Sequence, residues 1–239
     1  MKFVLVHGGW QGGWAWDAVA SELESRGHEA FAPTLRGLTE GDADRAGVTV
    51  TDMAAGLIEE IKRRGLDAFV LVGHSGGGPV AQLVVDRLGY RVRRIMFMSA
   101  WVLRDGQSIN DVKLVNAPHT TDTTVPMDPD LWATKFMQDA TPQQLAAVIP
   151  RLVPSPIGWF DQRIELPRFF DLHLPSSYIF LRHDLSAPRE LFQQMADRLD
   201  NPLIVECDGS HQAMLTRPAA VADALIAATG NGHAQGAWS

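Results

Sequence analysis

The stretch Val70-Leu71-Val72-Gly73-His74-Ser75-Gly76-Gly77-Gly78 decides the fold of this chain. It starts with an apolar run of the kind found in buried strands, and it ends in the pattern Gly-X-Ser-X-Gly. A pattern typical of a helix follows at once, through Pro79, Val80, Leu83, Val84, Val85 and Leu88. We therefore expect a strand, a sharp turn and a helix, with Ser75 at the tip of the turn. Gly73 and Gly77 would let the strand and the helix approach each other without a Cβ atom between them.

This turn resembles the nucleophile elbow of the α/β-hydrolase fold. In such an elbow Ser75 Oγ projects from the end of the strand. The N-terminus of the following helix offers free N–H groups and a partial positive charge to a developing oxyanion. The alternative is a Gly-rich connection without chemistry.

Composition limits the class of protein. The 239 residues, 46% of them hydrophobic, are enough for one α/β domain with a substantial core. The formal net charge of -7 argues against nucleic acid or an anionic membrane as a partner. No run is long and apolar enough to span a bilayer or to act as a signal sequence, so we expect a cytoplasmic protein, with a cleaved export signal as the alternative. A single cysteine, Cys207, excludes an internal disulfide.

Strand and helix patterns alternate along most of the chain. The predicted strands cover 3–6, 28–32, 70–72, 94–99, 177–181 and 203–206. The predicted helices cover 17–26, a segment that begins at Thr51 or Asp52 and ends at Arg64, 79–88, 188–199 and 218–228. This alternation predicts an α/β fold with a mostly parallel central sheet and helices on both faces.

The alternation breaks between residues 101 and 176. This segment has no clear strand and is rich in proline and large apolar residues, and 131–139 and 142–149 read as short helices. We expect a helical cap insertion over the active site. The alternative is an ordinary helical layer packed on the sheet. The predicted core is then 1–100 together with 177–229, and 230–239 is a Gly-rich, flexible tail.

A serine nucleophile needs a base within hydrogen-bond reach and an acid that orients the base. The resembled fold supplies them in the chain order Ser, acid, His. His211, in Gly209-Ser210-His211-Gln212, resembles the His loop of the small esterase and hydroxynitrile lyase branch, so it is the expected base. The other histidines fit less well: His7 is expected to be structural, His74 fills the variable elbow position, and His119, His173, His183 and the tail residue His233 have no motif.

The acid is expected to be Asp184, which follows a predicted strand at the position where the resembled family commonly keeps its aspartate. Asp105 is the alternative, because some branches place the acid after the strand that follows the elbow. Asp208 is too near His211 in sequence to aim easily at its ring. Two N–H groups should form the oxyanion hole. One comes from Gly76, and the other comes from Gly9, which is the matching position of the resembled family in the loop after the first predicted strand.

The chain looks most like compact serine esterases related to plant methylesterases and hydroxynitrile lyases, which use no metal or organic cofactor. Two positions depart from the lyases. Gly8 stands where they carry threonine, and Gln212 stands where they carry a lysine that places positive charge beside leaving cyanide. Both differences favour hydrolysis.

The resemblance therefore implies a serine hydrolase that forms an acyl-enzyme on Ser75. Its small-molecule substrate would be a small, mostly apolar carboxylic ester, with an aromatic group favoured, and a carbamate or lactone would use the same machinery. The candidate pocket residues are aromatic: Trp10, Trp101, Trp132, Trp159 and Phe160. A hydroxynitrile-lyase-type C–C lyase and a non-catalytic ligand sensor are the alternatives. The sequence leaves open whether the chain forms homo-oligomers.

Overall fold

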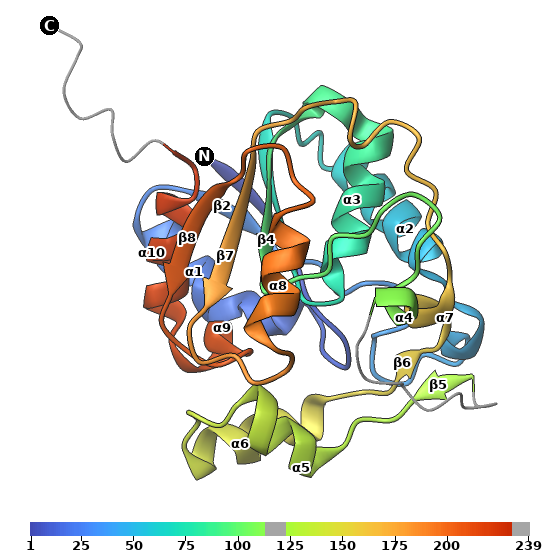
Figure 1. Ribbon diagram of the computed structural model, residues 1–239. Helices are drawn as coiled ribbons and strands as arrows, with labels where there is room; N and C mark the ends of the chain where they lie inside the picture. The colour runs from blue at the N-terminus through green and yellow to red at the C-terminus, as the bar shows by residue number, and fades with distance from the viewer. Residues whose placement is uncertain (113–122, 231–239) are drawn as a thin grey trace, which may run out of the picture.

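A computed structural model describes residues 1–112 and 123–230 of the chain (Figure 1). The predicted tail beyond residue 230 lies outside the described residues, as do His119 and His233.

A six-stranded sheet forms the centre of the molecule. Its strand order is β2-β1-β3-β4-β7-β8, and every neighbouring pair is parallel. The strands are β1 (Lys2–Val6), β2 (Glu29–Phe31), β3 (Phe69–His74), β4 (Val92–Met98), β7 (Ser176–Leu181) and β8 (Leu203–Cys207). The predicted α/β fold with a parallel central sheet is confirmed. Because all six strands run the same way, their carboxyl ends meet at one edge of the sheet.

Helices cover both faces of the sheet (Figure 1). One face carries α1 (Asp17–Ser25), α9 (Ala213–Thr216) and α10 (Pro218–Ala227), and the other carries α2 (Val50–Arg63), α3 (Gly77–Leu88) and α8 (Arg189–Ala196). Alternate strand residues supply the two cores: Phe3 and Leu5 pack toward α1, whereas Val4 and Val6 pack toward α2 and α3. Short 3-10 turns cover Gly13–Trp16, Arg45–Gly47, Gly89–Arg91 and Ile149–Arg151.

The start of α2 differs from the prediction. Thr49, not Thr51 or Asp52, is the N-cap residue, and the helix begins at Val50. The Thr49 hydroxyl accepts the N–H of Asp52 (3.2 Å), and the Asp52 carboxylate accepts the N–H of Thr49 (3.0 Å). Asp52 is thus the third residue of the helix, and its side chain forms a capping box with Thr49.

Residues 101–176 contain several short elements. They are α4 (Ile109–Val112), β5 (Thr124–Val125), α5 (Pro129–Leu131), a π-helical turn (Trp132–Phe136), α6 (Pro142–Val148), β6 (Ser155–Pro156) and α7 (Gly158–Asp161). The expectation of no strand here was wrong, because β5 and β6 pair antiparallel. The predicted helix over 131–139 was also wrong in its extent. Its centre is the π-helical turn, and the helix ends before Met137.

The segment packs in two places. Trp132, Met137 and Val148 form a small cluster beyond the carboxyl edge of the sheet, where Figure 1 shows α5 and α6. Residues 164–172 instead join the main core beside α3, where Asp86 accepts the backbone N–H groups of Arg168 and Phe169 (both 2.8 Å). The division of the chain into a core and a cap at residues 101 and 176 stays a prediction.

No helix within residues 1–112 and 123–230 is both long and apolar enough to cross a membrane.

Candidate active site

Ser75 occupies a strained turn between β3 and α3. Its φ angle is 53°, a left-handed conformation that is uncommon for a residue with a side chain. Close packing leaves no room for Cβ atoms around it. A Cβ on Gly77 would lie 2.6 Å from the carbonyl oxygen of His7, and one on Gly73 would lie 3.0 Å from Cα of Gly78. The glycines therefore allow β1, β3 and α3 to meet directly beneath Ser75, as the sequence pattern predicts.

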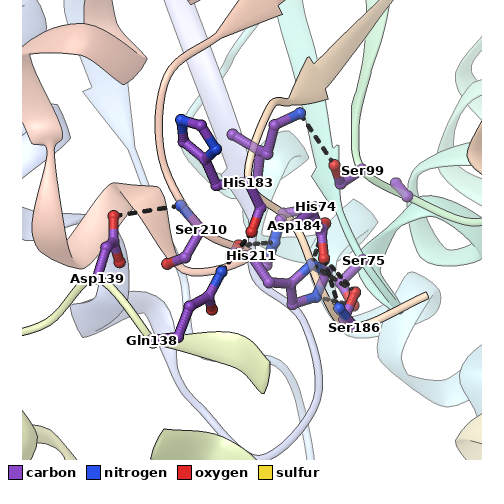
Figure 2. A network of polar contacts seen from close by, with 12 residues as sticks. His74, Ser75, Ser99, Gln138, Asp139, His183, Asp184, Ser186, Ser210 and His211 are labelled. Carbon is purple, nitrogen blue, oxygen red and sulfur yellow. Dashed lines mark hydrogen bonds and ion pairs between the residues drawn. The ribbon is translucent and has the colours of Figure 1, made fainter. Parts of the chain in front are cut away.

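A chain of hydrogen bonds joins Ser75 to His211 and Asp184 (Figure 2). The Ser75 hydroxyl donates to Nε2 of His211 (2.9 Å), and Nδ1–H of His211 donates to Oδ2 of Asp184 (2.7 Å). Each residue lies in the loop after a strand: Ser75 after β3, Asp184 after β7 and His211 after β8. The side chains of His211 and Asp184 are 3% and 2% exposed, so their interaction is shielded from water.

Ser186 completes the surroundings of Asp184. Its hydroxyl and its backbone N–H both donate to Oδ1 of Asp184, at 2.6 Å and 2.8 Å, and its Oγ lies 3.0 Å from Nδ1 of His211. Burial opposes ionisation of Asp184, but the neighbouring His211 and the bonds from Ser186 outweigh it and lower the pKa of Asp184. Asp184 is therefore held as a carboxylate. Sequence reasoning missed Ser186, although a serine two residues after an aspartate is a recognised local bonding pattern.

The two other candidate acids are engaged elsewhere. Asp105 is exposed, and its Oδ1 accepts the backbone N–H of Leu166 (2.7 Å). Asp208 pairs with His183 (2.9 Å) and Arg217 (3.0 Å). Of the three aspartates weighed from the sequence, the structure brings Asp184 to His211.

Two buried histidines support the site without joining the chain of bonds. His74 donates from Nε2 to the carbonyl oxygen of His211 (2.9 Å), and the centres of the two rings lie 4.6 Å apart. His7 accepts the N–H of Leu35 on Nε2 (3.0 Å) and donates from Nδ1 to the carbonyl of Gly8 (2.8 Å). Burial lowers the pKa of His7 to about 4 and holds that of His74 well below its usual value. Both rings are thus neutral near pH 7 and act as fixed hydrogen-bonding groups.

Aromatic rings pack around the imidazole of His211. The ring centre of Phe136 lies 5.1 Å from that of His211, and the ring of Phe192 stacks at 6.5 Å with an interplanar angle of 15°. Neither phenylalanine was predicted as a site residue from the sequence, because each comes from a distant segment and carries no motif. Together with the low exposure of His211, they keep the base in an apolar setting.

The loop after β1, which contains Gly9 and Trp10, is held in place by residues 153–155, which precede α7. Trp10 has a φ angle of 63°, its N–H donates to Oγ of Ser155 (2.8 Å), and its carbonyl accepts the N–H of Val153 (2.8 Å). These two bonds fix the backbone next to Gly9. Ser155 was also missed, since the contact joins residues that are 145 positions apart.

The predicted pocket residues take three different positions. The ring of Trp10 lies within 6.3 Å of those of Trp132 and Phe160, measured between centres, so these three form one aromatic group. Trp159 is buried against the elbow, and its indole N–H donates to the carbonyl of Gly76 (2.8 Å). Trp101 packs against Phe192 (5.9 Å between ring centres), and its backbone N–H donates to the carbonyl of Ser75 (3.2 Å).

Comparison with known proteins relates most of the chain to one family. The model of the alpha/beta hydrolase family matches residues 3–224. The chain is 35% identical over 109 residues to the carbendazim hydrolyzing esterase of Nocardioides sp. (strain SG-4G), an alignment that spans 45% of each protein. It is 25% identical over 250 residues to polyneuridine aldehyde esterase of Rauvolfia serpentina, covering 94% of both.

A solved structure is similar over nearly the full chain. An extracellular alpha/beta-hydrolase from a Paenibacillus species is 28% identical, with a TM-score of 0.89, covering 95% of this chain and 98% of that one. That hydrolase is described as sharing structural and functional homology with tobacco salicylic acid binding protein 2.

Proposed function

Because this chain belongs to the alpha/beta hydrolase family, we propose that it is a serine-dependent esterase with Ser75 as nucleophile, His211 as general base and Asp184 as the orienting acid. One observation carries the proposal. The Ser75 hydroxyl, the His211 imidazole and the Asp184 carboxylate form a continuous hydrogen-bonded chain, with bonds of 2.9 Å and 2.7 Å. This arrangement supports proton removal from Ser75 as its oxygen attacks a carbonyl carbon.

The reaction is acyl transfer to water. His211 takes the proton of Ser75 as the tetrahedral intermediate forms, then gives it to the leaving alcohol, which leaves an acyl group on Ser75. A water molecule, deprotonated by His211, attacks the acyl carbon. The second intermediate then collapses, His211 returns the proton to Oγ of Ser75 as the bond to the acyl carbon breaks, and the acid is released. Asp184 holds the tautomer of His211 in which Nε2 is free to accept the proton, and it stabilises the imidazolium.

We assign the oxyanion hole to the backbone N–H groups of Gly9 and Gly76. The bonds to Ser155 and Val153 support this by fixing the peptides of Trp10, and the bond from Trp159 supports it by fixing the carbonyl of Gly76. Held in this way, the two donors would need no reorganisation when the oxyanion forms.

The substrate we propose is a small, mostly apolar ester with an aromatic acyl or alcohol group. The aromatic group formed by Trp10, Trp132 and Phe160 lies beside β5, because the indole N–H of Trp10 donates to the carbonyl of Val125 in that strand (3.0 Å). Such rings favour flat apolar groups through edge-to-face and offset contacts. Two relatives are esterases named for carbendazim and for polyneuridine aldehyde. Their names support a first panel of test substrates made up of esters and carbamates.

Two positions support hydrolysis over cyanohydrin cleavage. Gly8 lacks a side chain, and a Cβ there would lie 2.9 Å from Cβ of Ser75, so a threonine would not fit without a shift. Gln212 is buried and uncharged at pH 7, so it offers no positive charge to leaving cyanide.

The test is a comparison of three outcomes with one purified protein. Release of p-nitrophenol from a panel of short-chain and aromatic esters is the expected result. Faster release of cyanide from mandelonitrile than of alcohol from any ester would replace the proposal by a lyase. Tight binding of an aromatic ester without turnover would replace it by a sensor.

A further inference from the structure

A short segment of the chain runs beside the loop that carries His211. It consists of residues 136–139 and begins at Phe136, the last residue of the π-helical turn. The carbonyl of Phe136 accepts the backbone N–H of Gln212 (2.9 Å), and Oδ2 of Asp139 accepts the backbone N–H of Ser210 (3.3 Å). The segment therefore bonds to the residue before His211 and to the residue after it, while the Phe136 ring packs on His211 itself. Figure 2 shows the bond between Asp139 and Ser210 beside the site.

Asp139 holds more of this loop than Ser210 alone. Its Oδ2 also accepts from the hydroxyl of Thr216 and from Nε of Arg217, both at 3.2 Å. Burial opposes ionisation of Asp139, but the bonds from Ser210, Arg217 and Thr216 outweigh it and lower the pKa of Asp139. The Asp139 carboxylate thus accepts three hydrogen bonds, from Ser210 before α9, from Thr216 at the end of α9 and from Arg217 directly after it. Charge-assisted bonds of this kind are about twice as strong as neutral ones.

The same segment reaches the loop of the acid. Gln138 donates from Nε2 to the carbonyl oxygen of His183, the residue before Asp184. Residues 136–139 therefore touch the chain next to both partners in the His211–Asp184 pair. None of the hydrogen bonds of this segment involves the reacting atoms, so their effect on catalysis has to pass through the placement of His211 and Asp184.

We propose that Asp139 is a positioning residue for His211. It holds the loop between β8 and α9 so that Nε2 of His211 faces Ser75. The proposal rests on the function proposed above. Its physical basis is that Ser210 is fully buried, so loss of the Asp139 acceptor leaves a buried N–H without a partner and the loop has to move to satisfy it. A displacement of about 1 Å at a catalytic group can cost about 100-fold in rate.

Two substitutions at Asp139 and one control test this role. Asp139→Ala is expected to lower kcat by about 10- to 100-fold with little change in KM, because base alignment is lost while the pocket is kept. Asp139→Asn keeps an acceptor for Ser210, so it should retain most of the activity. Asp128→Ala is the matched control. Asp128 accepts two backbone N–H groups at the start of α5 (2.9 Å and 3.2 Å) and touches no part of the His211 loop, so kcat should stay unchanged. If Asp139→Ala does not fold, Asp139→Glu replaces it, since it keeps the charge but displaces the acceptor by one methylene, and the same loss of kcat is expected.

A second readout does not depend on turnover. The proton on Nδ1 of His211, bonded to Asp184, gives a downfield NMR signal that we expect to weaken or exchange faster in Asp139→Ala and to stay unchanged in Asp128→Ala. If the wild-type protein hydrolyses no ester but the Nδ1–H signal changes as expected in Asp139→Ala, the proposed esterase function is rejected and the positioning role of Asp139 is kept. An unchanged signal, or a kcat loss no larger than in the Asp128 control, would overturn the role of Asp139.

Discussion

Replacing Asp184 by asparagine tests how the acid works. In the structure Oδ1 of Asp184 accepts two bonds from Ser186 and Oδ2 accepts Nδ1–H of His211. An asparagine has one oxygen and one NH₂ group. If the oxygen keeps the bond to the backbone N–H of Ser186, the NH₂ group faces Nδ1 of His211. The imidazole then has to present a lone pair at Nδ1 and carry its proton on Nε2, where it cannot accept the proton of Ser75.

The expected loss is large because the wrong tautomer removes the base rather than weakening it. The same substitution in a serine protease lowers kcat by about 10⁴, which corresponds to about 5.4 kcal/mol of lost transition-state stabilisation at about 1.36 kcal/mol per tenfold. We expect a loss of that order in Asp184→Asn, measured as kcat for p-nitrophenyl acetate, with the fold retained by circular dichroism. Asp105→Asn is the control and should keep nearly full activity, because an amide oxygen can still accept the N–H of Leu166. A loss of less than about tenfold in Asp184→Asn, or a larger loss in Asp105→Asn, would refute the reasoning.

Three further substitutions follow from particular contacts. Gly78→Ala would place a Cβ 2.1 Å from the carbonyl oxygen of Trp101, so we expect a loss of about 1–3 kcal/mol of stability by thermal or denaturant unfolding; an unchanged midpoint would contradict it. Trp132→Ala should shift the ratio of kcat/KM between an aromatic ester and a short acetate by about 10- to 200-fold, whereas equal losses on both would return Trp132 to a purely structural role. Ser186→Ala removes one bond to Asp184 and should raise its pKa. A carboxyl group whose pKa is lower in the folded than in the unfolded protein stabilises the fold at pH values above its unfolded-state pKa, and this stabilisation is lost as the pH falls. The variant should therefore be less stable than wild type at pH 7. The difference should narrow below about pH 3.8, and a stability difference that is constant with pH would argue against this role.

The parts of the site that follow strand ends could be predicted from the sequence. Ser75 lies in a motif with a local mechanism, since the turn needs glycines on both sides of the serine. His211 and Asp184 follow apolar runs that read as strands, and parallel strands bring their carboxyl ends to one edge. Predicting these three residues required only the order of elements along the chain and the resemblance to a family. The structure brings their side chains together.

The supporting contacts could not be predicted because they join distant segments without any pattern. The bond from Trp10 to Ser155 and the packing of Phe136 on His211 depend on how the chain returns between β4 and β7, and nothing local in the sequence encodes that path. The start of α2 was misplaced for a different reason. Thr49 is the N-cap and forms the capping box with Asp52. Thr51 and Asp52, two and three positions after Thr49, are also of residue types that commonly cap helices, so the sequence alone did not distinguish them from Thr49.

Labelling with a fluorophosphonate tests the central claim, the role of Ser75 as an activated nucleophile, most directly. The reagent phosphonylates a serine, with loss of fluoride, when a base removes the proton of that serine, so it reports the nucleophile whatever the natural ester is. We predict that the intact protein gains one adduct, that tryptic mass spectrometry places it on Ser75, and that Ser75→Ala gains none and hydrolyses no ester while its unfolding midpoint stays near that of the wild type. An adduct on another serine, or ester hydrolysis retained in Ser75→Ala, would contradict the account.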